Sequence, residues 1–398
     1  FGWWAASGDV DGDGARELVV GDPEAGPIDN GIVTRYDDLE RGATLDAASD
    51  AGATFLGPTG TFQGLFVQSG ELTGDTVDDI AFASSSGTVH VLPGPVTGTL
   101  RTGDAWVVID DLDSASLDAS PLLVADATGD GVADLVLGDP YGTGLWVVAG
   151  PLPTRSGSVG DLAARKLGGT TSAAPGWALA AGDFAGDGVG DIVTGDPFAR
   201  PGSTATGQVW LLRDGVPDGA TIDTLPHTAT GEREGAGFGG ALDACDLDAD
   251  GRDDLVVAAS AVYDDEDGAV FVFFGGISDR TGAADADVRL AGGAAGGAFG
   301  YALACGDWDA DGVADLAVGE PVADAGASDS GAVHIWYGPV AGGAASARDA
   351  DASVTGGVAD AIYGAGVTAV GDLDGDGSDE LAVAGQVYAL DLLFGGGL

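Results

Sequence analysis

An acidic loop recurs seven times along this chain at nearly constant intervals. The copies begin at Asp9, Glu71, Asp126, Asp183, Asp246, Asp307 and Asp372, so successive copies start 62, 55, 57, 63, 61 and 65 residues apart. The fullest copies read Asp-x-Asp-x-Asp-Gly, as at residues 246–251. This interval is too long for one turn of a solenoid and suits a four-stranded blade with generous loops. A length of 398 residues therefore does not have to mean two or three separate domains.

Strand patterns flank each acidic loop. A short run of small and apolar residues precedes the loop, as at 299–306, and suits an inner strand near a narrow axis. A buried apolar run follows it and ends in Gly and Pro, as at 134–140. A third run alternates after a glycine, as at 268–273, and the fourth is weakest, with candidates at 106–109 and 287–290. The pattern predicts an all-β propeller.

We expect one propeller domain over residues 1–398. Its repeats are expected at approximately 1–62, 63–117, 118–174, 175–237, 238–298, 299–362 and 363–398.

Composition narrows the possible partners. The net charge is −50, and the only lysine is Lys166, so phosphate backbones and anionic membranes would be repelled. No run of eighteen apolar residues occurs, so membrane insertion is not expected. The start at Phe1 lacks a methionine and a signal-peptide pattern, which suggests a processed or excised piece.

Two cysteines precede consecutive acidic loops. Cys245 and Cys305 are too few for a disulfide scaffold and lack the spacing of a zinc site. A bridge between neighbouring inner strands and two buried free thiols are the alternatives.

A second signature lies eight residues before some of the loops. Phe1-Gly2, Phe238-Gly239 and Phe299-Gly300 there resemble the FG-GAP repeats of integrin alpha subunits, and the likeness extends over nearly the whole chain. The resemblance implies a seven-bladed β-propeller with a calcium-binding hairpin loop in each blade. It also implies that the calcium lies between the first two strands, on the face opposite the usual ligand surface. Repeats two to four depart from the signature with Gln63, Asp118 and Pro175, and Tyr363-Gly364 is shifted by one residue.

The last blade poses a separate question, because the sequence ends soon after its third strand. Either this blade lacks an outer strand or residues 392–394 supply one.

The loops have the chemistry of calcium ligands. Calcium prefers six to eight oxygens, which acids at positions 1, 3, 5 and 9 and the carbonyl of position 7 can supply, while glycine at position 6 permits the sharp turn. Loops one, five, six and seven carry all four acids. Their expected ligands are Asp9, Asp11, Asp13, Ala15 and Glu17; Asp246, Asp248, Asp250, Arg252 and Asp254; Asp307, Asp309, Asp311, Val313 and Asp315; and Asp372, Asp374, Asp376, Ser378 and Glu380.

The other three loops are incomplete. Loop three has Thr128 at position 3, loop four has Ala185 there, and loop two has Thr76 in place of the glycine and should bind least. Their expected ligands are Asp126, Thr128, Asp130, Val132 and Asp134; Asp183, Asp187, Val189 and Asp191; and Glu71, Thr73, Asp75 and Asp79. We expect five to seven Ca²⁺ ions in all. An EF-hand would need Glu at position 12, where Val20 or Val257 lies inside an apolar β-branched run.

No enzymatic motif is evident. His90 and His334 occupy the same place in two repeats, which packing explains better than catalysis, and His227 stands alone. We expect a non-catalytic, calcium-stabilised extracellular adhesion or assembly module, secreted or at the cell surface, because extracellular calcium sites bind at about 0.1 to 1 mM. A propeller lectin is the alternative, and a calcium-dependent polysaccharide-active enzyme is a third.

The expected partner surface is the face opposite the calcium loops, for either a protein or a glycan. Its distinctive segments are 198–201, 231–235 and 263–267. A lectin should repeat an exposed aromatic in several blades, and Trp3, Trp106, Trp177 and Trp308 do not recur in that way. This favours a protein partner.

Overall fold

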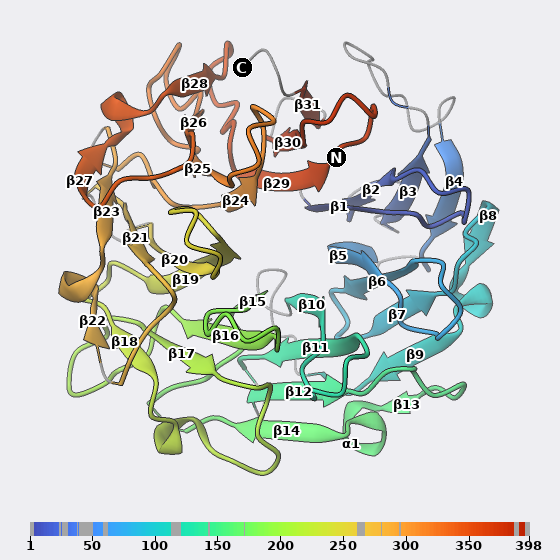
Figure 1. Ribbon diagram of the computed structural model, residues 1–398. Coiled ribbons are helices and arrows are strands. Elements are labelled where there is room, and N and C mark those ends of the chain that lie inside the picture. The colour runs from blue at the N-terminus through green and yellow to red at the C-terminus, as the bar shows by residue number, and fades with distance from the viewer. Residues whose placement is uncertain are drawn as a thin grey trace.

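The chain forms a ring of seven sheets around a central axis (Figure 1). The computed structural model describes residues 4–23, 25, 31–37, 39, 51–58, 63–112, 121–141, 144–170, 172–260, 267–279, 281–293, 296–385 and 390–394. The seventh sheet lies beside the first, so that the ring closes (Figure 1). The predicted all-β, seven-bladed propeller is therefore confirmed.

Each blade is built from strands that follow one another outward from the axis. The bounds are, for blade 1, β1 (Trp4–Gly8), β2 (Glu17–Asp22), β3 (Ile32–Tyr36) and β4 (Ala51–Leu56); for blade 2, β5 (Gln63–Gly70), β6 (Asp79–Ser84), β7 (Val89–Leu92) and β9 (Val107–Asp110); for blade 3, β10 (Leu122–Ala125), β11 (Asp134–Asp139), β12 (Gly144–Val148) and β14 (Arg165–Gly168); and for blade 4, β15 (Ala178–Gly182), β16 (Asp191–Asp196), β17 (Gln208–Leu212) and β18 (Thr228–Thr230).

The remaining blades follow the same plan. They comprise, for blade 5, β19 (Phe238–Cys245), β20 (Asp254–Ala259), β21 (Ala269–Phe273) and β23 (Val288–Ala291); for blade 6, β24 (Leu303–Gly306), β25 (Asp315–Glu320), β26 (Ala332–Trp336) and β28 (Ala352–Thr355); and for blade 7, β29 (Gly366–Gly371), β30 (Glu380–Ala384) and β31 (Asp391–Phe394). The described helical elements are short: α1 (Val159–Leu162), η1 (Thr102–Asp104), η2 (Ile222–Thr224), η3 (Ala283–Asp285) and η4 (Ala347–Asp349).

Several blades gain a fifth strand from the next repeat. The strands β8 (Gly98–Arg101), β13 (Gly157–Ser158), β22 (Thr281–Gly282) and β27 (Gly343–Ser346) pair in parallel with β4, β9, β18 and β23. The sequence pattern predicted four strands per blade, with the weak fourth strand outermost. The added strands cover backbone groups that an edge strand would otherwise leave open to another chain.

The last blade has three strands within the described residues. Leu392 and Leu393 belong to β31, which pairs with β30, so this segment is a third strand and not an outer strand. Ring closure is apolar: Ala5 and Leu18 of blade 1 pack in one cluster with Val370 and Ala382 of blade 7.

The second strands form the buried centre of the blades. All six residues of β6, β11, β16, β20 and β25 are buried, because neighbouring blades cover both faces of each strand. Glycine permits the closest contact. A Cβ atom on Gly195 would lie 2.1 Å from the carbonyl oxygen of Gly239 in the next blade. Both the Gly-Asp ending of the second strand and the Gly of the Phe-Gly signature thus serve the packing between blades.

Candidate metal centres

All seven acidic loops join the first strand of a blade to the second. In blade 5, for example, β19 ends at Cys245 and β20 begins at Asp254, with loop five between them. The loops therefore lie together at one face of the propeller. Strands, not helices, follow position 9 in every copy, which excludes the EF-hand.

Four loops gather acidic oxygens closely enough to hold a cation. One ligand atom per residue lies within 4.8 Å of the others in each of four groups: Asp9, Asp11, Asp13 and Glu17; Asp246, Asp248 and Asp250; Asp307, Asp309 and Asp311; and Asp372, Asp374 and Glu380. These are the loops with complete acid sets. Among the described residues, loops two, three and four form no such group.

The loop backbone is organised by the acid at position 1. In loop five, Asp246 Oδ1 accepts a hydrogen bond from the Asp250 amide at 3.0 Å, and Oδ2 accepts one from the Gly251 amide at 2.9 Å. Gly251 adopts a φ of 87°, which a residue with a Cβ rarely adopts. Loops three and four keep these bonds: in loop three, Asp126 Oδ2 accepts from the Gly131 amide at 2.7 Å, and in loop four Asp183 Oδ2 accepts from the Gly188 amide at 2.7 Å.

The acid at position 9 has two different settings. Asp254 accepts hydrogen bonds from the Leu247 amide at 2.9 Å and, with its other oxygen, from the Gly275 amide beyond β21 at 2.8 Å. Asp315 makes the equivalent pair with Trp308 and Gly338. These two aspartates tie each loop to the end of the third strand, and neither joins its acidic group, whereas the longer Glu17 and Glu380 do. Ligation by Asp254 and Asp315 stays a prediction.

Burial makes several position-9 acids hard to ionise without a cation. Desolvation, with a contribution from Asp11, raises the pKa of Glu17 to about 7, and desolvation with loop-seven aspartates raises the pKa of Glu380 to about 7. Desolvation likewise raises the pKa of Asp254 to about 6. A nearby cation would favour the ionised form of each.

The donor set fits a hard divalent cation such as Ca²⁺. The grouped atoms are all carboxylate oxygens, the ligands that calcium prefers. Among the described residues, the buried Oε1 atom of Glu380 has no hydrogen-bond partner, and it belongs to the residue that closes the loop-seven group. A bound cation would supply the missing contact.

An arginine side chain contacts the acidic group of loop one, which the sequence pattern did not predict. The buried Arg35 on β3 places Nη1 3.1 Å from Asp11 Oδ2 and also donates to the Val96 carbonyl at 2.8 Å. Arg35 therefore neutralises part of the acidic group of loop one. The sequence did contain a sign of this contact, because Arg35 is a charged residue within a strand whose other residues are apolar, small or aromatic.

A second unpredicted feature joins neighbouring loops. Asp253, at position 8 of loop five, accepts a hydrogen bond from the Asp183 amide at 2.7 Å, while its own amide donates to the Asp183 carbonyl at 3.1 Å. Asp78 and Asp379 form the same reciprocal pair with Asp9 and Asp307. The sequence signal for these bonds is a pair of adjacent acids, at 78–79, 253–254 and 379–380. The first acid of each pair binds the preceding loop, and the second occupies position 9 of the loop that contains the pair.

Loop two deviates most from the others. Thr76 has a φ of 84°, the region taken by glycine in the equivalent position elsewhere, which is strained for a β-branched residue. Glu71 Oε1 accepts the Thr73 amide at 2.9 Å, so the longer acid still organises the turn. In loop three, among the described residues, the buried Thr128 Oγ1 has no hydrogen-bond partner.

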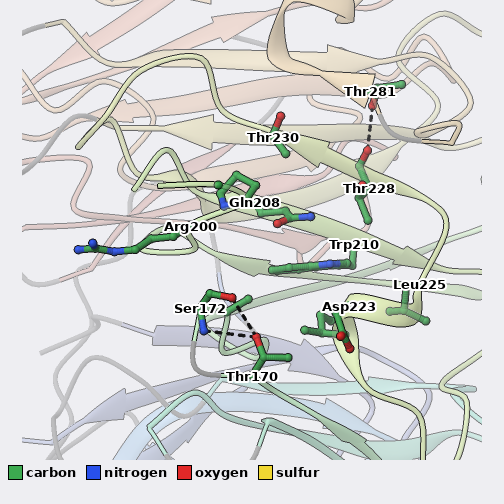
Figure 2. A pocket seen from close by; sticks show the side chains of 14 residues that line it. Thr170, Ser172, Arg200, Gln208, Trp210, Asp223, Leu225, Thr228, Thr230 and Thr281 are labelled. Atoms are coloured by element: carbon green, nitrogen blue, oxygen red, sulfur yellow. Dashed lines mark hydrogen bonds between the residues drawn. The ribbon is translucent and has the colours of Figure 1, made fainter. Parts of the chain in front are cut away.

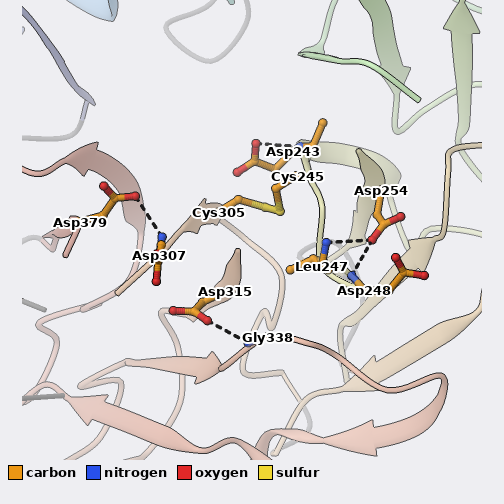
Figure 3. Close-up of a disulfide and its surroundings, with 11 residues drawn as sticks. Asp243, Cys245, Leu247, Asp248, Asp254, Cys305, Asp307, Asp315, Gly338 and Asp379 are labelled. Atoms are coloured by element: carbon orange, nitrogen blue, oxygen red, sulfur yellow. Dashed lines mark hydrogen bonds between the residues drawn. A yellow bond between two sulfur atoms is a disulfide. The ribbon is translucent and has the colours of Figure 1, made fainter. Parts of the chain in front are cut away.

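Cys245 and Cys305 form a disulfide (Figure 3). Their Cα atoms are 6.2 Å apart, and the bond links β19 to β24 of the next blade. Cys245 directly precedes Asp246, so the covalent link lies at the base of loop five. Of the two alternatives that the sequence allowed, the bridge is the one formed.

The histidines have structural partners. His90 is buried against Phe55 and Phe82, and desolvation lowers its pKa to about 4. His334 lies 3.0 Å from Glu320 Oε2 and 2.9 Å from Ser353 Oγ. These contacts agree with the packing role expected for the pair.

The opposite ends of the strands carry an aromatic group. Tyr141, Trp177 and Phe198 follow β11, precede β15 and follow β16, and we call them the aromatic trio. The ring centroids of Trp177 and Phe198 lie 5.0 Å apart, and those of Tyr141 and Trp177 lie 6.0 Å apart. Tyr141 is 47% exposed and Phe198 45%. Of the segments expected on this face, 198–201 includes Phe198 of the trio, whereas Tyr263 to Glu266 lie outside the described residues. Phe1, Gly2 and Asp118 of the repeat signature also lie outside them.

Family comparison identifies the repeats. The FG-GAP repeat family matches residues 175–212, 238–273 and 299–336, which begin at Pro175, Phe238 and Phe299. The chain contains FG-GAP repeats. The matched FG-GAP repeats include one in which proline replaces the phenylalanine.

Curated relatives carry related segments. The chain is 33% identical to human phosphatidylinositol-glycan-specific phospholipase D over 172 residues, 41% of this chain and 20% of that protein. It is 31% identical to integrin alpha pat-2 of Caenorhabditis briggsae over 225 residues, 52% and 17% of the two chains. It is 32% identical to integrin alpha-5 of Xenopus laevis over 175 residues, 42% and 15%. The aligned part thus spans a fifth or less of each relative.

A solved structure shares the fold. BBS1N in complex with ARL6DN, soaked with lead, aligns with a TM-score of 0.53 and 12% identity over 98% of this chain and 91% of that one. At this identity the likeness concerns the fold alone. Within the described residues, no helix has the length and hydrophobicity needed to cross a bilayer.

Proposed function

We propose that this chain is a calcium-stabilised extracellular module that binds a protein partner through the face opposite its acidic loops. The likeness to integrin alpha subunits supports an interaction role. In this proposal residues 1–398 act as one propeller domain, in which cations fix one face and leave the other for binding.

Calcium as the resident ion is supported by the grouped carboxylates. Four loops bring three or four acids together, and mutual repulsion of these charges favours a bound divalent cation. The loops themselves supply what a cation needs: position 1 holds the turn, position 3 presents a carboxylate in all four groups, and position 5, position 9 or both complete each group. Five to seven ions remain the proposed number.

The observation that carries the proposed partner surface is the aromatic trio. Exposed aromatic side chains are enriched where proteins bind one another, and this trio gathers two exposed rings around the half-buried Trp177 from two blades. Because the chain carries a net charge of −50, we propose a partner segment with basic side chains.

An extracellular setting is supported by two features. Disulfides persist in oxidising compartments, and Cys245 and Cys305 are bonded. Loops of this kind fill at the calcium levels found outside cells. We propose no catalytic role, and the phospholipase relatives are matched over only 20% of their length.

A display library of extracellular protein segments tests this proposal. In calcium, the chain should enrich segments with lysine and arginine, and Phe198→Ala should reduce binding at least about tenfold, as expected for an interface hot spot. Tyr301→Ala is the matched control, because Tyr301 is another exposed aromatic, at 41%. Equal loss with both variants, or enrichment of acidic segments, would contradict the proposal.

A further inference from the structure

A groove of about 470 Å³ lies between the end of blade 3 and the outer half of blade 4 (Figure 2). Its floor is one face of two paired strands: Gln208 on β17 stands opposite Thr230 on β18, and Trp210 stands opposite Thr228. We call it the Gln208 groove.

The facing wall adds further polar groups. Ser172 and Thr170 come from the loop after β14, and Asp223 comes from η2. Figure 2 shows these residues on the opposite side of Trp210 from Thr228 and Thr230, with Thr170 and Ser172 hydrogen-bonded to each other, while the guanidinium of Arg200 at the rim points away from Trp210.

Several of these groups have spare hydrogen-bonding capacity. Within the part of the chain that the structure describes, the side chains of Gln208, Thr228 and Thr230 make no hydrogen bond, although Thr228 is only 8% exposed. An amide and two hydroxyls supply both donors and acceptors. The polar atoms of these side chains are accessible from the groove, so a ligand that enters it can form hydrogen bonds with them.

The equivalent space in the next blade is narrowed by the FG-GAP phenylalanine. Phe271 occupies on β21 the place that Trp210 holds on β17, and the ring centroid of Phe238 lies 5.6 Å from that of Phe271. The cavity left there, about 330 Å³, is lined by Phe238 itself.

Blade 6 repeats this arrangement. Phe299 lies 6.0 Å from His334, the equivalent of Trp210 and Phe271, and His334 is already bonded to Glu320 and Ser353. Blade 4 differs because Pro175 stands where Phe238 and Phe299 stand. The substitution removes the ring that fills the space between blades and leaves the polar face of β17 and β18 open.

The chemistry of the groove selects a class of ligand. Its volume falls within the usual range of ligand sites, but its lining is richer in hydroxyl and amide groups than most. A peptide could not add a strand here, because β22 already pairs with the outer edge of β18. Asp223 and the net charge of −50 disfavour anionic ligands.

We propose that the Gln208 groove is a binding site for a short neutral saccharide. The hydroxyl groups of the saccharide would exchange hydrogen bonds with Gln208, Thr228 and Thr230. The Asp223 carboxylate would accept hydrogen bonds from two further hydroxyl groups of the saccharide. This site goes beyond the function proposed above, since no acidic-loop ligand and no member of the aromatic trio lines it, although the loop of Thr170 and Ser172 also borders the cavity beside the trio.

Saturation-transfer-difference NMR of the whole chain in calcium, with lactose, maltose, cellobiose and sucrose, tests this site. At least one of these sugars should bind. The double variant Gln208→Ala with Thr230→Val should weaken its binding at least about tenfold, because several hydrogen bonds to the ligand are lost together. Pro175→Phe should also weaken binding, because it introduces the ring that narrows the equivalent space in blades 5 and 6.

Two control variants show whether the sugar binds in the Gln208 groove or elsewhere on the propeller. Arg289→Ala alters the equivalent cavity of blade 5 and should bind sugar as the wild type does. Phe198→Ala should also keep sugar binding, so that failure of the protein-partner proposal can be told apart from failure of this one. Should Pro175→Phe not fold, which a melting curve reports, the double variant decides. The inference is overturned if no sugar binds, or if the double variant binds as the wild type does.

Discussion

Loops five and three adopt the same backbone turn with different charges. In both, the acid at position 1 accepts the amide of the glycine at position 6, at 2.9 Å in loop five and 2.7 Å in loop three. Both also hold the position-9 acid with the amide of position 2, at 2.9 Å in each. They differ at position 3, which is Asp248 in one and Thr128 in the other. Only loop five forms an acidic group within the described residues.

This comparison separates the fold of the loop from its binding of metal. Positions 1 and 9 shape the hairpin through bonds to the backbone, so the turn is preserved where position 3 is not acidic. Position 3 supplies the additional charge that makes a cation necessary. The complete loops should therefore be unstable without calcium and the incomplete loops nearly indifferent to it.

Removal of calcium should have the largest effect. Each site saturated at a hundred times its Kd contributes about 2.7 kcal/mol, so chelation that empties four loops should lower the Tm by more than about 10 °C. Differential scanning calorimetry with calcium and with a chelator measures this. Magnesium in place of calcium is the control and should restore little, because it demands a tighter octahedral site.

Single-loop variants sharpen the comparison. Asp248→Asn in loop five should cost about 2 kcal/mol in calcium, since one site is lost, and should become neutral or slightly stabilising in chelator, where it relieves repulsion. Urea unfolding measures both values. Glu71→Gln in loop two keeps the acceptor oxygen and should change stability by less than about 0.5 kcal/mol in either condition. Equal losses from both variants would contradict the distinction between the loops.

The bond between neighbouring loops should come next. Asp253→Ala removes the carboxylate that accepts from the Asp183 amide and should cost about 1 to 2 kcal/mol, with or without calcium. Glu232→Ala, on an exposed loop, is the control. If the loss vanished in chelator, the bond would depend on metal and not on the loop backbone.

The pH dependence of stability should come from Asp243, which lies on β19 just before loop five. Burial, with a smaller contribution from Asp253, raises the pKa of Asp243 to about 7, so ionisation opposes folding above that pH. Asp243→Asn should stabilise the fold by at least about 1 kcal/mol at pH 8, lose this gain as the pH falls from 7 toward 4, and change nothing below. Denaturation across this range measures it, and a constant gain would show that ionisation is not the cause.

Backbone strain should have the smallest effect. Thr76→Gly in loop two should stabilise the fold by about 1 kcal/mol, because glycine adopts the observed φ of 84° without strain. Gly131→Thr makes the opposite change in loop three and should destabilise by a similar amount. Thermal unfolding compares the two, and a loss from Thr76→Gly would refute the strain.

The repeat and the pattern of expected ligands could be predicted from the sequence, but the contacts between repeats could not. Seven loops, the strand order and the hairpin position follow from periodicity, because identical positions face identical neighbours. The reciprocal bonds of Asp78, Asp253 and Asp379, the added strands such as β8 and the bond from Arg35 to the Val96 carbonyl join different repeats, and a pattern within one repeat does not encode its neighbour. The Gln208 groove is the clearest case. Pro175 departs visibly from the repeat signature, yet the consequence of that departure appears only beside Trp210.

Counting bound calcium tests the central claim most directly. Native mass spectrometry of the calcium-equilibrated chain should detect at least four ions, five to seven at saturation, and one fewer in Asp248→Asn but not in Glu71→Gln. A chain that carries no calcium, or the same number of ions in all three proteins, would contradict the account.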